Sequence, residues 1–255
     1  MAASASRNDG ALHRLFPATL ASLAVLSATL VVSAWGDCPT NTVSCMDDNG
    51  TTVSTTTTEA TAGCHEHRTG AGYDLGLGSF SATGVGGPGG TINFTGNAIA
   101  SDTYVIVGLP VGTPLAFQVA FTVQASAHDD IGCVDFGTAE GASASASLHD
   151  LTAGTSDGVS VSTSSVCGFP GICCYSSSDV NRTLLFAVTH AAGESFTLRY
   201  EMYASAYGHG FGNVSAQIGF VGLPDGAQVI SCQGYHGPVT PTRNFTWGAL
   251  KTRYR

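Results

Sequence analysis

The sequence predicts an all-β protein, built as an antiparallel two-sheet β-sandwich of the jelly-roll-like or immunoglobulin-like kind and containing disulfide bonds. Three observations predict this class. Long stretches alternate apolar and polar residues, which is the pattern of a strand with one buried face. Turn segments rich in Gly, Pro, Asn and Asp separate these stretches, and helical periodicity is missing after the N-terminal segment. All eight cysteines follow a segment typical of an export signal, and exported cysteines usually pair.

Residues 1–36 are expected to be a signal peptide. The segment starts with basic residues, continues through an apolar run over 18–32, and ends in small residues before a cut at Asp37. A membrane anchor is the alternative, but it needs about 20 apolar residues, and Pro17 with several Ser and Thr shortens this run. We therefore expect cleavage, and no transmembrane helix in the mature chain.

The mature chain is acidic. The precursor holds 9 Lys+Arg and 18 Asp+Glu, and loss of the signal peptide removes two arginines and one aspartate, which leaves 7 basic and 17 acidic groups. Such a surface repels nucleic acid and anionic membranes. We expect a secreted protein, extracellular or at the cell surface with the periplasm as the alternative, and no nucleic-acid partner.

The cysteines predict a disulfide framework whose pairing the sequence leaves open. Adjacent residues such as Cys173 and Cys174 could bond to each other only through a strained ring, because disulfides prefer Cα atoms about 5.5–6 Å apart. We expect these two to have different partners. The eight are Cys38, Cys45, Cys64, Cys133, Cys167, Cys173, Cys174 and Cys232.

Strands are expected throughout residues 71–236, the predicted sandwich domain. The alternation is clearest in "LAFQVAFTVQAS" from Leu115, in "SFTLRYEMYAS" from Ser195 and in "NVSAQIGF" from Asn213. The pattern predicts further strands at 91–98, 103–107, 142–148, 159–165, 183–189 and 227–232.

The two ends of the mature chain differ from the domain between them. Residues 37–70 are rich in Thr and Cys and are expected to form an arm or edge strands held by disulfides, with a glycosylated stalk as the alternative. Residues 237–255 form a Pro/Thr linker and a basic-aromatic tail, which we expect to act as a recognition or retention signal. The residues of this tail signal are Trp247, Lys251, Tyr254 and Arg255. Docking of Trp247 on the sandwich is the alternative.

The last third of the chain resembles a group of exported bacterial β-sandwich proteins of unknown function, often found with a sorting tag. The resemblance runs from "TLLFAVTH" at Thr183 to the pattern "A.I.F.GLP.G..V.SC.GY", which ends at Tyr235. It is a resemblance of spacing rather than of catalytic residues, so it implies the fold and export but no activity.

The stretch "CHEH" is the strongest candidate for a metal site. On a strand, His65 and His67 would point to the same face and could chelate a metal, while Cys64 would point away. Two ligands are too few for a stable site. The alternative is a pair of exposed histidines beside a structural disulfide.

The acids Asp129, Asp130 and Asp135 form a second candidate group, with Glu140 close behind them. In a turn they would suit Ca²⁺, which takes about six to eight oxygen ligands. Paired carboxylates could also hydrolyse a glycosidic bond. We predict no catalytic residue, and calcium is the single cofactor that these acids suggest.

The loop "YASAYGHGFG" holds a third candidate site. Tyr203, Tyr207 and Phe211 could form a platform on which a sugar ring stacks, because aromatic rings offer an apolar face. Packing at the edge of the sandwich is the alternative. The expected function is an exported, non-enzymatic structural or adhesive protein with glycan or cell-envelope partners. A carbohydrate-binding module or a glycan-active enzyme is the alternative.

Overall fold

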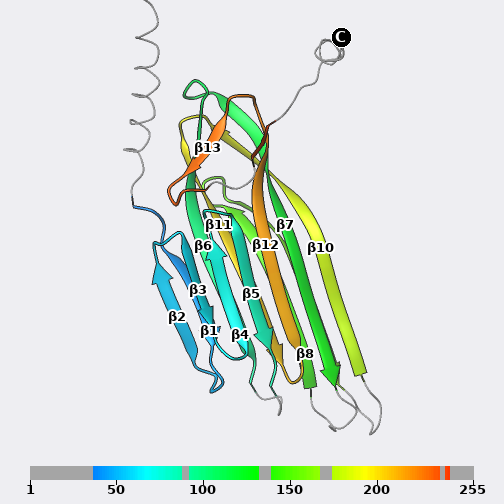
Figure 1. The fold of residues 1–255 in the computed structure, drawn as a ribbon. Coiled ribbons are helices and arrows are strands. Elements are labelled where there is room, and N and C mark those ends of the chain that lie inside the picture. Colours follow the sequence, from blue (N-terminus) through cyan, green and yellow to red (C-terminus); the bar gives the residue numbers. More distant parts are fainter. Residues whose placement is uncertain (1–36, 88–91, 132–138, 167–173, 236–238, 242–255) are drawn as a thin grey trace, which may run out of the picture. The chain divides into compact units, whose positions relative to one another are not determined.

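The computed structural model describes residues 37–87, 92–131, 139–166, 174–235 and 239–241. These residues form β-strands joined by turns, and the strands build two sheets that pack face to face (Figure 1). The predicted fold class, an antiparallel two-sheet β-sandwich containing disulfides, is therefore confirmed. In the described part of the chain, no helix is long and apolar enough to cross a membrane.

The first sheet, sheet A, has the strand order β2-β1-β6-β11-β8-β9, and β13 pairs with the second half of β6. Every pairing in it is antiparallel. Its strands are β1 (Asn41–Met46), β2 (Thr52–Thr57), β6 (Phe94–Val107), β8 (Ala139–Asp150), β9 (Thr155–Val166), β11 (Ser195–Tyr207) and β13 (Gln228–Ser231).

The second sheet, sheet B, has the order β10-β7-β12-β5-β4-β3. The short β14 adds to β12 in parallel, while the other pairings are antiparallel. Its strands are β3 (Thr61–His65), β4 (Thr69–Asp74), β5 (Ser79–Val85), β7 (Pro114–Ile131), β10 (Cys174–Ala191), β12 (Phe211–Leu223) and β14 (Val239–Pro241).

The two sheets lie with corresponding strands opposite each other. The strands β1, β6, β11 and β8 of sheet A contact β4, β5, β12 and β7 of sheet B. The edge strands β2 and β3 lie on one side of the sandwich and β9 and β10 on the other, as Figure 1 shows for β2 and β10. Residues 37–70 supply β1, β2 and β3, so this Thr-rich segment lies at one side of both sheets.

One prediction about the strands was wrong. Residues 91–98 and 103–107 were expected to form separate strands, but β6 runs without a break from Phe94 to Val107. The alternation of buried and partly exposed residues changes at Ser101 and Asp102, which are both buried. This change of phase makes one long strand look like two in the sequence.

The core changes in side-chain size along several of the long strands. In β7 the inward residues start with Leu115 and Phe117 and end with Ala125 and Ala127, all of them buried. The same gradient runs through β11, from Phe196 to Ala206. Stacked and tilted rings fill the wide end of the sandwich, which holds Tyr104, Phe117, Phe196, Phe220 and Tyr235.

At the opposite end the sheets approach so closely that only glycine fits at several inward positions. A Cβ atom on Gly84 of β5 would lie 2.7 Å from the carbonyl oxygen of Phe94 in β6. A Cβ on Gly212 of β12 would lie 2.6 Å from the carbonyl oxygen of Ser143 in β8. The sandwich therefore has an aromatic end and a narrow end lined by Gly and Ala.

Candidate functional site

Two disulfides hold the N-terminal strands to the rest of the sandwich. Cys45 of β1 bonds to Cys64 of β3 and so joins sheet A to sheet B. Cys38 bonds to Cys232, which follows β13, and closes a loop with a sequence separation of 194. The Cα separations of 6.0 and 5.7 Å are in the usual range. Cys133, Cys167 and Cys173 fall outside the described residues, and only the backbone of Cys174 is described.

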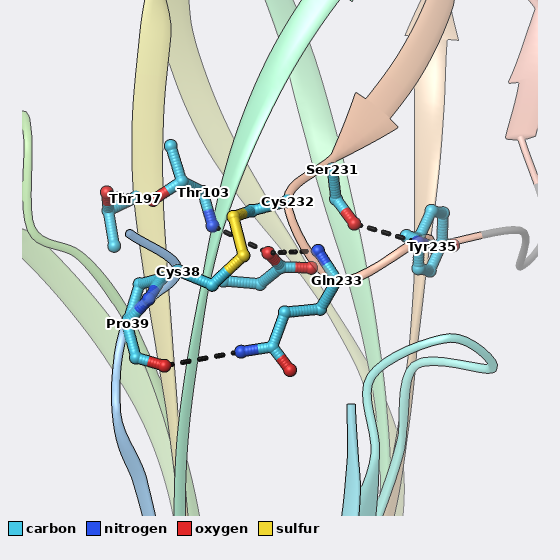
Figure 2. The surroundings of a disulfide bond; sticks show 9 residues. Cys38, Pro39, Thr103, Thr197, Ser231, Cys232, Gln233 and Tyr235 are labelled. Carbon is cyan, nitrogen blue, oxygen red and sulfur yellow. Dashed lines mark hydrogen bonds between the residues drawn. A yellow bond between two sulfur atoms is a disulfide. The ribbon is translucent and has the colours of Figure 1, made fainter. Parts of the chain in front are cut away.

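The buried carboxylate of Asp102 lies next to the backbone of Cys232, whose disulfide with Cys38 is drawn in Figure 2. Asp102 of β6 accepts hydrogen bonds from the backbone N–H groups of Thr103 at 2.8 Å and Gln233 at 3.2 Å. Burial raises the pKa of Asp102 to about 6, and the hydrogen bonds that it accepts offset this rise only in part. The Gln233 side chain also donates to the carbonyl of Pro39, so residues around both cysteines are tied together.

A buried polar pair, Asp150 and His190, joins the two sheets at the aromatic end. Nε2 of His190 in β10 lies 2.7 Å from Oδ2 of Asp150 in β8, and both side chains are almost fully buried. Oδ1 of Asp150 accepts from the N–H groups of Thr152 and Ala153 in the following turn. The His190 ring stacks on Phe196, with centroids 4.2 Å apart. This pair has the contacts of a structural bridge between sheets.

The structure places the two predicted metal-binding histidines in different settings. The strand β3 ends at His65, so His67 lies in the turn before β4 rather than on the same strand face. Nδ1 of His67 is 3.4 Å from Oδ2 of Asp48, and Cys64 is already bonded to Cys45. Within the described ranges, no group of three or more His, Cys, Asp or Glu residues could hold a metal ion.

The predicted calcium turn is not a turn at Asp129 and Asp130. Both residues belong to β7, which continues to Ile131. Asp129 is buried and accepts a hydrogen bond from the backbone N–H of Ser176 at 2.6 Å. The side chain of Asp130 and all of Asp135 lie outside the part of the structure that is described.

The predicted aromatic platform is divided between the two sheets. Tyr203 and Tyr207 lie in β11 of sheet A, whereas Phe211 lies in β12 of sheet B. The prediction that the three rings share one platform was wrong because the short segment between β11 and β12 crosses from one sheet to the other. Tyr203 lies on the outer face of sheet A, where 37% of it is exposed.

Phe211 instead belongs to a different group of rings on the outer face of sheet B, which we call the ring row. Its members are Phe211, His128 of β7 and Tyr175 of β10, from three adjacent strands. The centroid of His128 is 6.4 Å from that of Phe211 and 6.5 Å from that of Tyr175. The sequence could have placed His128, because the alternation that starts at Leu115 points this residue outward. The sequence does not indicate which residues of other strands lie next to His128.

The outer face of sheet A carries mostly small polar side chains, with Tyr203 as a large exception. One row crosses five adjacent strands in register and contains Ser44, Asn97, Tyr203, Ser145 and Ser160. In the neighbouring row, the hydroxyls of Ser143 and Ser205 form a hydrogen bond of 2.8 Å. Arg199 and Glu201 on this face neutralise each other through a 2.7 Å ion pair.

Comparisons with known proteins give no family for this chain. No protein-family model matches it, and a search of curated proteins finds no match. The predicted tail signal at Trp247, Lys251, Tyr254 and Arg255 lies outside the described residues and stays a prediction.

Proposed function

We propose that this protein is exported and acts without catalysis, as a structural or adhesive β-sandwich outside the cytoplasm. The observation that carries this proposal is the pair of outer sheet faces. Each is built from small, mostly uncharged polar side chains across several strands, as in the row from Ser44 to Ser160 on sheet A. A rigid face of this kind can contact another surface over a large area without closing around a small substrate.

Three further points support export. The disulfides Cys38–Cys232 and Cys45–Cys64 form readily in an oxidising compartment and are rare in the cytosol. The apolar run within residues 1–36 suits a cleaved signal peptide. The resemblance of the last third of the chain to exported bacterial β-sandwich proteins supports the same location.

A bead assay tests the adhesive role. Beads carry protein that is expressed from the full-length gene and purified oxidised, and matched beads carry the same protein after reduction and alkylation. We expect the oxidised beads to be retained on at least one layer among mucin, chitin, cellulose and collagen, and the reduced beads to be lost. Release of soluble sugar or peptide from the layer would contradict a non-enzymatic role, and equal retention of both bead types would contradict a role for the folded faces.

Carbohydrate binding is the second candidate, and the ring row is the observation that favours it. Exposed aromatic rings next to hydroxyl and amide groups suit the mixed polarity of a sugar. A glycan-active enzyme is the less favoured form of this candidate, since it would also require paired carboxylates on an open cleft.

A further inference from the structure

The outer face of sheet B is nearly uncharged around its centre. The sequences of β5 and β12 contain no Asp, Glu, Lys or Arg, and β7 contains only Asp129, which is buried, and Asp130 at its end. The outward positions carry amides and hydroxyls instead. Across four strands in register they include Asn181, Gln124, Ser215 and Ser81 in one row, and Thr183, Thr122, Gln217 and Ser79 in the next.

The ring row borders this neutral polar face toward the narrow end of the sandwich. Phe211 lies directly opposite His128 in the register of β12 and β7. The exposed fractions of Phe211 and Tyr175 are 37% and 66%. Each of these two rings makes an angle of 28° with the His128 ring. Exposed rings that lie together on one sheet face mark a candidate binding surface.

The central ring is held in place before any ligand arrives. Nδ1 of His128 lies 3.3 Å from the hydroxyl of Tyr175, and its Nε2 lies 3.3 Å from Oδ1 of Asp179. These contacts fix the ring between its neighbours. A surface ordered in advance loses less conformational entropy on binding.

The chemistry of this face selects one class of ligand. Sugar rings offer C–H faces that pack on aromatic rings, and hydroxyl groups that hydrogen-bond to amides and hydroxyls. A charged polymer would need Lys or Arg opposite its acidic groups, and β5, β7 and β12 contain neither. On β10, the charged group in contact with the ring row is the acidic Asp179, which would repel an acidic polymer, and Arg182 is in register with the inward Val123 rather than with the outward row. We propose that the ring row and the neutral face beside it bind an uncharged polysaccharide chain.

This inference rests on the adhesive role proposed above and gives that role a site. The chain would cross β12, β7 and β10, with Phe211 and Tyr175 stacking on sugar faces and His128 between them. The amides of Gln124 and Asn213 lie on the same face, where Thr83 already donates a hydrogen bond of 2.9 Å to Oδ1 of Asn213. Contacts of this type orient a sugar without charge.

Binding to a defined panel of polysaccharides tests the proposal. The probes are cellulose, chitin, xylan and galactomannan, with alginate and heparin as the charged comparison. We expect the oxidised protein to bind at least one neutral polymer more tightly than either charged one. We expect Phe211→Ala and Tyr175→Ala each to weaken that binding about tenfold, since one aromatic stacking contact contributes that much.

Tyr203→Ala is the matched control. Tyr203 has the same exposed fraction as Phe211, 37%, but lies on sheet A, so its removal is expected to leave binding unchanged. Tyr175→Phe is a second variant that keeps the ring and loses only the contact with His128, and we expect it to bind more tightly than Tyr175→Ala. Urea unfolding of each variant separates lost binding from lost folding.

Different results would overturn the glycan site and the adhesive role. Loss of binding in Tyr203→Ala but not in Phe211→Ala would move the site to sheet A and overturn this inference, while the adhesive role would stand. Binding to none of the neutral polymers would also overturn it, and retention of the beads on mucin or collagen would then decide the adhesive role separately. A dimer that Phe211→Ala converts to a monomer would show that a second copy of the chain covers the rings, and would refute a glycan site.

Discussion

Gly212 of β12 and Ser143 of β8 approach each other across the sandwich so closely that a Cβ on Gly212 would lie 2.6 Å from the carbonyl oxygen of Ser143. The carbonyl oxygen of Ser205 would be 2.7 Å from the same atom. Both contacts are with backbone, which cannot rotate away as a side chain can. The absence of a side chain at position 212 therefore sets how closely the two sheets pack at the narrow end.

Gly212→Ala is expected to destabilise the protein by about 1–3 kcal/mol, because overpacking a core forces backbone shifts. Gly63→Ala in β3 is the matched control. Its Cβ would meet its nearest neighbour at 3.5 Å, an ordinary contact, and the position is exposed. We expect this control to stay within about 0.5 kcal/mol of the wild type. Urea unfolding at neutral pH measures both, and equal effects of the two substitutions would refute the close approach at Gly212.

The fold was predictable from sequence wherever one face of a strand is buried and the other is wet. The segment from Leu115 shows this contrast, and it lies within β7. The contrast is weak in β4 (TGAGYD), because Thr69 and Ala71 on the buried face differ little in hydrophobicity from Gly70 and Gly72 on the other face. The sequence of β7 shows the decrease in side-chain size from Phe117 to Ala127. It does not show that β8, β11 and β12 decrease in the same direction, which is what makes one end of the sandwich narrow.

The candidate sites were less predictable than the fold, because they depend on which strands become neighbours. Phe211 was identified as a platform ring, but with Tyr203 and Tyr207 as partners. Residues that are close in the sequence lie on different sheets here, because the chain passes from one sheet to the other between β11 and β12. The neighbours of Phe211 come from β7 and β10 through pairing that the sequence does not encode locally.

Removing the Cys38–Cys232 bond is expected to cost more stability than removing Cys45–Cys64. In the chain-entropy model a disulfide stabilises by restricting the unfolded chain, and the effect grows with loop length. The sequence separations are 194 and 19, so we expect losses of about 5 and 3 kcal/mol. Urea unfolding of Cys38→Ala/Cys232→Ala and Cys45→Ala/Cys64→Ala measures them. The reverse order would contradict the entropic account, and peptide mapping without reduction checks both pairings in the wild type.

Asp102 is expected to make the protein more stable in mild acid. Its folded pKa of about 6 lies above the usual value near 4, so the folded state binds the proton more tightly than the unfolded state does. The resulting stabilisation is complete below about pH 4 and is lost as the pH rises through 6. Between pH 7.5 and 4, Asp102 contributes a gain of about 2 kcal/mol.

Asp102→Asn isolates this contribution from those of other groups. The amide keeps an oxygen that can accept from the N–H groups of Thr103 and Gln233 but does not titrate in this range. The free energy of unfolding in urea is measured from pH 4 to 7.5 for both proteins. We expect the difference between them to change with pH, and a constant difference would show that Asp102 has an ordinary pKa.

The pair Asp150–His190 is expected to stabilise the contact between the two sheets at the aromatic end. His190→Ala leaves the buried Asp150 carboxylate with the turn N–H groups of Thr152 and Ala153 but without its 2.7 Å partner from β10. When one member of a buried polar pair is removed, the other stays buried without its partner and pays its full desolvation cost, so we expect destabilisation of about 3 kcal/mol.

The adjacent His149 is the matched control, because its side chain is 32% exposed and its contact with Glu201 is 3.8 Å long. We expect His149→Ala to cost less than about 1 kcal/mol. Urea unfolding at pH 7.5 compares the two substitutions, and an equal loss from both would mean that the buried pair does not join the sheets.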